Sequence, residues 1–260
     1  MNARFVMDFE PGTRTVASSG PGATGAVHKS GMQSIIEGMC GRFVLFQPES
    51  FLDAVGQWPG VSEVHAPQGL PPARYNIAPT QTIPIIRVKE TFAAIEPARW
   101  GLLPHWKKDE QGPPLFNARA ETVASKPSFR DAYKKNRCVI PLDGYYEWHT
   151  GEDGKKQPYY VTAPEGQLWA AGLWGTGLDK LSATMVTTAA TDEMEWLHGR
   201  LPKFLLSEEI RPWLEGDMSG DLLQPSGLRG FHTRPADPAV GNVRNDYAEL
   251  IEGPAEKTLF

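Results

Sequence analysis

Short apolar segments bounded by turn-forming residues recur along this chain, and they constrain the fold more than any other feature. Segments of this length that are rich in β-branched and aromatic side chains are typical of strands. We expect strands at 42–46, at 82–88, at 91–96, within 137–162 around a turn at 151–154, at 168–174, at 183–188 and near 240–244. We expect helices at 48–58, 127–135, 191–197 and 207–214. Because strands outnumber helices and do not alternate with them regularly, the sequence predicts an α+β fold with mostly antiparallel sheet.

Composition divides the 260-residue chain into a tail and a folded part. Residues 1–38 are rich in Gly, Ser, Ala, Thr and Pro and carry no periodic apolar pattern, so we expect them to be disordered. Such a segment is either upstream sequence from a mis-assigned start or a removable pro-segment. Length allows one domain of about 220 residues plus a tail, or two small domains, and folded structure is expected to begin at Met39.

Charge and cysteine content exclude several classes of protein. The net charge of −5 argues against a surface coated in basic groups, so any nucleic-acid contact needs a local patch. The two cysteines, Cys40 and Cys138, suit a reducing compartment, and no Cys/His cluster has the spacing of a zinc site. No apolar run approaches the ~20 residues of a membrane span, and the first thirty residues lack the apolar core of a secretory signal. We therefore expect a cytoplasmic protein with no membrane partner and no metal.

Cys40 follows Met39 in the stretch Met-Cys-Gly-Arg-Phe, and it could become a chain terminus. If translation starts at Met39 and this methionine is removed, Cys40 carries a free α-amine beside its thiol. A 1,2-aminothiol condenses with an aldehyde to an imine and then closes a thiazolidine ring. The two groups titrate near ~8 and ~8.5, so both nucleophiles are accessible around neutral pH. The alternative is that Cys40 is a small buried side chain.

Three further segments carry candidate site residues. Asn117 and Arg119 lie in Asn-Ala-Arg-Ala-Glu-Thr, where an amide and a guanidinium could position a substrate or simply make a surface turn. Strand alternation puts Tyr145, Glu147 and His149 on one face, so Glu147 is a candidate acid or base of raised pKa if that face is shielded from water.

His198 precedes Gly-Arg-Leu-Pro, which forces a turn. A histidine at such a junction can shuttle protons near neutral pH, or it can cap the end of the preceding helix.

Basic residues gather between Arg119 and Arg137. Six basic and two acidic residues give this stretch a charge of +4 within a chain of −5. With Trp100, Trp106 and Tyr145 nearby in sequence, the pattern suits neutralisation of a phosphate backbone and stacking of bases on single strands. A solvated helix face is the alternative.

The order of the motifs resembles one known family. The motifs are MCGRF (39–43), RYNIAPTQ (74–81), WGLLPHW (100–106), NARAET (117–122), DGYYEW (143–148), a Thr-rich strand (184–188) and HGRLP (198–202). Together they resemble the SRAP family of SOS-response-associated peptidases, or abasic-site processing proteins, across residues 39–252. The resemblance implies a compact α+β domain with twisted, barrel-like antiparallel sheets, flanking helices and a DNA-binding groove.

The resemblance also implies a role for each matched residue. Cys40 would form a thiazolidine with the aldehyde of an abasic site in single-stranded DNA, without a cofactor. Asn117 would hold the reacting groups, Glu147 would be the acid/base, and His198 would assist opening of the sugar ring and strand cleavage. The implied DNA-binding residues are Arg42, Trp106, Arg119 and Thr187.

The implied activities are covalent protection of abasic sites in the DNA damage response, AP-lyase chemistry and autoproteolysis that exposes Cys40. A monomer is expected, with replication-fork proteins as further candidate partners. One departure is the 38 residues that precede Met39, since the chemistry needs a free amine on Cys40. Two other hypotheses stay open: a thiol peptidase that acts on other proteins through Cys40, His198 and Glu147, and a non-catalytic module that binds single-stranded nucleic acid.

Overall fold

The computed structural model describes residues 4–6 and 41–253. The strands are β1 (Arg4–Val6), β2 (Arg42–Leu45), β3 (Glu63–His65), β4 (Arg74–Ile77), β5 (Thr82–Lys89), β6 (Phe92–Trp100), β7 (Asn117–Arg119), β8 (Arg137–Leu142), β9 (Gly144–Thr150), β10 (Lys156–Thr162), β11 (Leu168–Gly175), β12 (Ser182–Ala189), β13 (Arg200–Pro202) and β14 (His232–Pro235). The helices are α1 (Pro48–Gly56), α2 (Ala120–Val123), α3 (Arg130–Lys135) and α4 (Ser207–Glu215), with short 3₁₀ turns η1 (Gly177–Asp179), η2 (Asp221–Leu223), η3 (Pro238–Gly241) and η4 (Ala248–Ile251). The α+β class expected from the sequence is confirmed.

Five strands of the larger sheet close into a barrel. Their order is β6-β5-β8-β11-β12, each antiparallel to the next, and β12 then pairs in parallel with β6. The closing pairs are Ser182 with Arg99 and Ala183 with Trp100. Closure removes two exposed edges that would otherwise need covering. The barrel-like shape implied by the family resemblance is therefore present.

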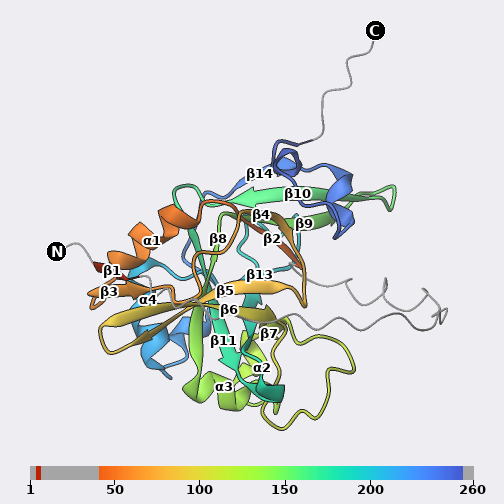
Figure 1. The fold of residues 1–260 in the computed structure, drawn as a ribbon. Helices are drawn as coiled ribbons and strands as arrows, with labels where there is room; N and C mark the ends of the chain where they lie inside the picture. Colours follow the sequence, from red (N-terminus) through yellow and green to blue (C-terminus); the bar gives the residue numbers. More distant parts are fainter. Residues whose placement is uncertain (1–3, 7–40, 254–260) are drawn as a thin grey trace, which may run out of the picture.

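A second sheet, in the order β14-β10-β9-β2-β4, is antiparallel throughout. Figure 1 shows it as a layer over the barrel, with α2 and α3 at the opposite end of the molecule. Its inner face adds Phe43 and Tyr145 to the main core, where they contact Trp100 and Phe204 respectively. Its outer face carries Tyr146, which packs in a smaller cluster below the C-terminal segment.

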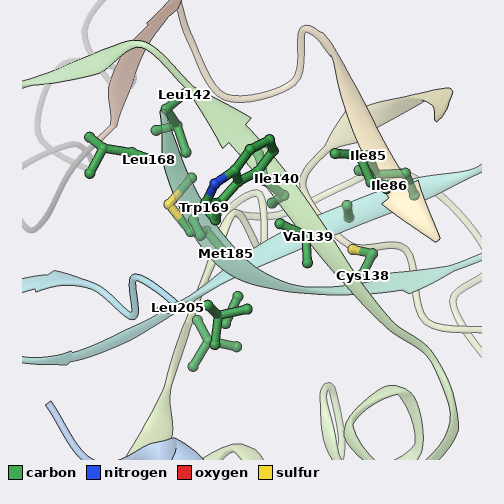
Figure 2. Packing of buried hydrophobic residues seen from close by; sticks show 14 of the residues in the cluster. Ile85, Ile86, Cys138, Val139, Ile140, Leu142, Leu168, Trp169, Met185 and Leu205 are labelled. Atoms are coloured by element: carbon green, nitrogen blue, oxygen red, sulfur yellow. The ribbon is translucent and has the colours of Figure 1, made fainter. Parts of the chain in front are cut away.

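Side chains from the barrel strands fill the interior. All six residues of β8 are buried, as a strand covered on both faces requires. Figure 2 shows Cys138, Val139 and Ile140 of β8 among side chains of β5, β11 and β12. Burial raises the pKa of the Cys138 thiol far above its ordinary range, so this cysteine serves as a packing residue.

Several sequence-based expectations differ from the structure. Residues 191–197 form turns rather than a helix, because Ala190 N–H donates to the Gly199 carbonyl at 3.0 Å and brings the two ends of the segment together. A straight seven-residue helix would hold those ends ~10 Å apart. Residues 240–244 are not a strand, since Asp237 caps the 3₁₀ turn η3 by accepting from Ala239 N–H, and Pro238 begins that turn.

Smaller differences concern boundaries. The helix expected at 127–135 begins at Arg130, β6 extends to Trp100, and the loop before Arg74 contains β3. Residues 4–6, within the segment expected to be disordered, form β1 in parallel pairing with β3. The rest of that segment lies outside the described residues, so its disorder stays a prediction.

Asn76 anchors the C-terminal segment to the second sheet. Its buried side-chain amide donates to the carbonyls of Val240, Asn242 and Asn245 at 3.1, 3.1 and 2.8 Å. Asp246 accepts from the backbone N–H groups of Tyr75 and Asn76 at 2.6 and 3.0 Å. These bonds hold residues 238–247 against β4.

Replacing Asn76 with Ala should lower the free energy of unfolding by about 2–4 kcal/mol, because three carbonyls lose a donor and two of them lie in a partly buried setting. Urea denaturation followed by fluorescence measures this. Asn242→Ala is the matched control, since the side chain of Asn242 is exposed and the carbonyl that Asn76 uses is retained. Equal effects of the two substitutions would contradict the anchoring role.

Candidate active site

Strand β2 brings the start of the described domain to β9. Arg42 pairs with Tyr146, Phe43 with Tyr145 and Val44 with Gly144. Gly41, which is covalently bonded to Cys40, directly precedes Arg42, and Glu147 directly follows Tyr146 on β9. Cys40 itself lies outside the described residues.

Arg42 is buried at the beginning of β2. Its side chain is 4% exposed, and Nη1 donates to the Gly41 carbonyl at 2.8 Å. Burial lowers the pKa of its guanidinium, because a charged group loses hydration there. If Arg42 contacts a DNA phosphate as predicted, it does so as a buried guanidinium rather than an exposed one.

Glu147 lies on the inner face of β9 and is only 5% exposed. Its Oε1 accepts from the backbone N–H of Trp148 at 3.1 Å. Tyr159 of β10 is its cross-strand partner, so the two side chains share one face. The alternation expected from the sequence is confirmed: Tyr145 on the same face packs in the main core, whereas Tyr146 packs in the outer cluster. A face shielded from water was the condition for a catalytic role of Glu147, and this condition is met.

Three predicted residues meet on adjacent strands at the end of the barrel. Strand β7 runs parallel to β12, with Asn117 paired to Met185 and Arg119 paired to Thr187. Asn117 is half-buried, Arg119 is exposed and Thr187 is fully buried. The arrangement supports a shared site for Asn117, Arg119 and Thr187.

Arg200, which the sequence reasoning did not single out, links these strands. Its guanidinium donates to both carboxylate oxygens of Glu121 at 2.9 and 3.0 Å, and to the Thr187 carbonyl at 2.8 Å. These hydrogen bonds hold the pKa of Glu121 below its usual range. Arg200 lies within the quoted motif HGRLP, but nothing in the motif indicates that its side chain crosses from β13 to α2.

His198 lies just before β13 and is half-buried. Its Nδ1 is 3.0 Å from the backbone N and 3.1 Å from the carbonyl O of Arg200. A protonated Nδ1 donates to the Arg200 carbonyl, and an unprotonated Nδ1 accepts from the Arg200 N–H. In either tautomer Nδ1 is bonded to the backbone, which leaves Nε2 for proton exchange. Since residues 191–197 are not a helix, the alternative in which His198 caps a helix is wrong.

One hydrogen bond ties the two sheets together at this point. The His149 Nδ1–H group donates to the Trp196 carbonyl at 2.7 Å. His149 lies two residues beyond Glu147 on the same face of β9, and Trp196 lies two residues before His198. The bond therefore brings the segment of His198 to the strand of Glu147.

Trp106 lies farther out, in the loop between β6 and β7. Its side chain is 50% exposed, and the backbone bond from Leu102 N–H to the Leu115 carbonyl at 3.0 Å closes the loop two residues before Asn117. An exposed aromatic ring there suits the predicted contact with DNA, which stays a prediction.

Two further observations bear on the location and type of site. A cavity of about 220 Å³ opens among β4, β5, β6 and residues 68–72, and none of the described candidate residues lines it. The candidate site is therefore a surface between the sheets rather than this cavity. Within residues 4–6 and 41–253, no group of three His, Cys, Asp or Glu side chains could hold a metal ion.

Comparison with known proteins decides the family. The family model described as SOS response associated peptidase (SRAP) matches residues 39–243. The chain belongs to the SRAP family. The matched range includes every candidate residue discussed above, so the resemblance noted in the sequence is confirmed.

Curated relatives of this SRAP protein carry a common name. The abasic site processing protein YoqW of Bacillus subtilis is 36% identical over 226 residues, which covers 82% of this chain and 99% of the relative. YedK of Escherichia coli, which has the same descriptive name, is 31% identical with the same coverage. HMCES of Xenopus tropicalis, again named an abasic site processing protein, is 27% identical and covers 68% of this chain and 65% of its own length.

Solved structures share the fold. A Bordetella bronchiseptica protein matches with a TM-score of 0.63 at 24% identity, covering 76% of this chain and all of that one. A Bacteroides thetaiotaomicron protein matches with a TM-score of 0.57 at 27% identity, covering 64% of this chain and 78% of that one. In the part of this SRAP chain that the structure describes, no helix is both long and apolar enough to cross a membrane.

The ion pair of Glu121 with Arg200 should make stability depend on pH. Because the folded-state pKa of Glu121 is lowered, its contribution is present above the ordinary value of 4.5 and is lost as the pH falls through the folded-state pKa. Glu121→Gln should cost under about 1 kcal/mol at pH 7, since the carboxylate is half exposed, and the cost should vanish at low pH. Urea denaturation between pH 3 and pH 7 measures it, with Glu152→Gln in the exposed 151–154 turn as control. A cost that stays the same as the pH falls would contradict this assignment.

Proposed function

We propose that this protein processes abasic sites in single-stranded DNA by forming a covalent thiazolidine crosslink through the α-amine and thiol of Cys40. Membership of the SRAP family and the shared name of its curated relatives support the substrate. The observation that carries the chemistry is the pairing of Arg42 at the start of β2 with Tyr146 of β9, because Gly41 and the shielded Glu147 are the next residues along these two strands.

In the proposed reaction, the neutral α-amine attacks the aldehyde of the open-chain sugar. Glu147 protonates the carbinolamine oxygen, water leaves, and the Glu147 carboxylate takes back the remaining proton from nitrogen to give a neutral imine, to whose carbon the thiol adds to close the ring. The thiol proton ends on the nitrogen. General acid–base catalysis of such proton transfers typically raises the rate 10²–10⁴-fold. Holding the amine, thiol and aldehyde together also lowers the entropic part of the activation barrier, and effective molarities of ~10⁵ M or more measure this effect.

The other predicted residues have supporting roles in this proposal. Asn117 holds the sugar and the reacting cysteine by hydrogen bonds. His198, through Nε2, moves the proton that opens the deoxyribose ring and assists strand cleavage or crosslink reversal. The DNA backbone runs past Arg42, Arg119, Thr187 and Trp106. No cofactor is needed for any of these steps, and the protein acts as a monomer in the cytoplasm.

A second candidate, a thiol peptidase, draws support from the family's description as a peptidase. In this reading Cys40 attacks a carbonyl carbon, with His198 as base and Glu147 as orienting group. The one substrate that the sequence itself supplies is the Met39–Cys40 bond, whose cleavage would expose the amine that crosslinking requires. Release of residues 1–39 from the purified 260-residue chain, followed by intact mass measurement, tests this candidate. Turnover of unrelated peptides by a chain that retains residues 1–39 would favour a general peptidase.

Crosslinking should require a free amine on Cys40. A chain that starts at Met39 should give a shifted band with single-stranded DNA containing one abasic site on a denaturing gel, and its Cys40→Ala variant should give none. The 260-residue chain should crosslink only after cleavage before Cys40, because an amide nitrogen cannot form the imine. Crosslinking by the Cys40→Ala variant, or no crosslinking by any form, would overturn the proposal.

Replacing Glu147 with Gln should slow crosslink formation by about 10²–10⁴-fold and leave binding of uncleaved single-stranded DNA nearly unchanged, because the amide keeps the shape but cannot supply a proton. Single-turnover gel kinetics measure the rate. Glu49→Gln, at an exposed position in the first turn of α1, is the control. An unchanged rate for Glu147→Gln would exclude Glu147 as the acid/base.

A further inference from the structure

Three aromatic side chains form a surface patch that has no role in the reaction described above. The Trp196 ring contacts the Tyr159 ring at 5.1 Å and 87°, and the His149 ring at 5.6 Å and 51°. The His149 and Tyr159 rings contact each other at 6.5 Å. Trp196 is 46% exposed, so about half of this large ring faces solvent. These three residues are called the aromatic patch.

The aromatic patch borders the candidate active site. Tyr159 is the direct cross-strand partner of Glu147, and His149 follows Glu147 on the same face of β9. Trp196 precedes His198 by two residues. The Trp196 ring therefore packs on Tyr159, the cross-strand partner of Glu147, and Trp196 belongs to the segment that carries His198.

The position of Trp196 is fixed from both sides. Its carbonyl accepts from His149 Nδ1–H at 2.7 Å, and the neighbouring side chains of Met194 and Leu197 are buried in the core. Trp196 itself is 46% exposed and packs against Tyr159 and His149 rather than in that core. A rigid, half-exposed tryptophan of this kind is a ready surface for stacking, since little conformational entropy is lost when a ligand binds.

Charge around the patch indicates what the ligand is. Asp192 and Glu195, which are close to Trp196 in sequence, are both exposed. Carboxylates repel a phosphate, but they do not oppose the flat face of an uncharged ring. The ligand class that fits is therefore a nucleobase rather than the DNA backbone.

We propose that the aromatic patch stacks an unpaired nucleobase adjacent to the abasic residue, a role that rests on the proposed function. An abasic residue leaves its neighbouring base without a stacking partner on one side. The Trp196 ring takes the place of the missing base, and the stacked neighbour sets the sugar of the lesion beside Glu147 and His198. The aromatic patch thus binds the base beside the abasic residue, whereas the aldehyde is recognised through its reaction with Cys40.

A double-mutant cycle between protein and DNA tests the stacking. The protein starts at Met39, and the DNA is a single-stranded oligonucleotide with one tetrahydrofuran residue, which has no aldehyde and cannot crosslink. Trp196→Ala should weaken binding by about 5- to 20-fold, as expected for the loss of one exposed stacking contact, and Trp196→Phe should retain most of the affinity. When the bases on both sides of the tetrahydrofuran are also removed, the effect of Trp196→Ala should fall below about 2-fold. An equal loss on both oligonucleotides, or no loss on either, overturns the proposal.

A readout without substitution complements the cycle. 2-Aminopurine beside the tetrahydrofuran should lose fluorescence when the wild-type protein binds, and an unchanged signal at saturation overturns the proposal. Tyr247→Ala, at an equally exposed aromatic residue beside η4, should change neither affinity nor fluorescence. Crosslinking of a natural abasic site by wild-type protein separates the two ideas. If the wild type crosslinks and Trp196→Ala binds normally, only the stacking proposal is overturned. If the wild type neither binds nor crosslinks, the stacking proposal and the proposed function are both overturned.

Discussion

Strand β12 is the element on which the architecture depends, because it pairs with four other strands. It is antiparallel to β11 and β13 and parallel to β6 and β7. The pairing with β6 closes the barrel. The pairing with β7 sets Asn117 opposite Met185 and Arg119 opposite Thr187. Both faces of β12 are also covered, since seven of its eight residues are buried. Its small threonine and alanine side chains allow neighbouring strands to approach from several directions.

The candidate site forms where the second sheet diverges from this barrel. Toward the centre of the molecule, the space between the sheets is filled by Phe43, Tyr145 and Trp100. Toward the C-terminal end of β9 burial decreases, and the inner face of this strand carries Glu147 and then His149 in place of apolar residues. The packed side of this boundary accounts for the low exposure of Glu147, which is 5% exposed.

The local features of this fold could be predicted from the sequence, whereas the long-range ones could not. Period-two alternation placed Glu147 on the inner face of β9 correctly, because that inference needs only neighbouring residues. The parallel closure of β12 on β6 joins segments more than eighty residues apart, and no local pattern encodes it. Arg200 was missed for the same reason, since its partner Glu121 is 79 residues away in sequence. The motif order led to the right family because it samples all of these segments together.

Lys203 illustrates a further limit of pattern reading. Its side chain is 1% exposed, and its Nζ contacts Glu209 Oε1 at 2.9 Å, while Glu209 Oε2 accepts from Leu206 N–H at the start of α4. A lysine in an apolar run would ordinarily indicate a surface position, because burying an unpaired ammonium is costly. Here one carboxylate both neutralises the charge and caps the helix that follows. The pair thus joins the end of β13 to α4, and it fixes the strand whose first residue, Arg200, bonds through its backbone to the ring nitrogen Nδ1 of His198. A structural ion pair outside the site consequently supports the geometry of the proposed proton shuttle.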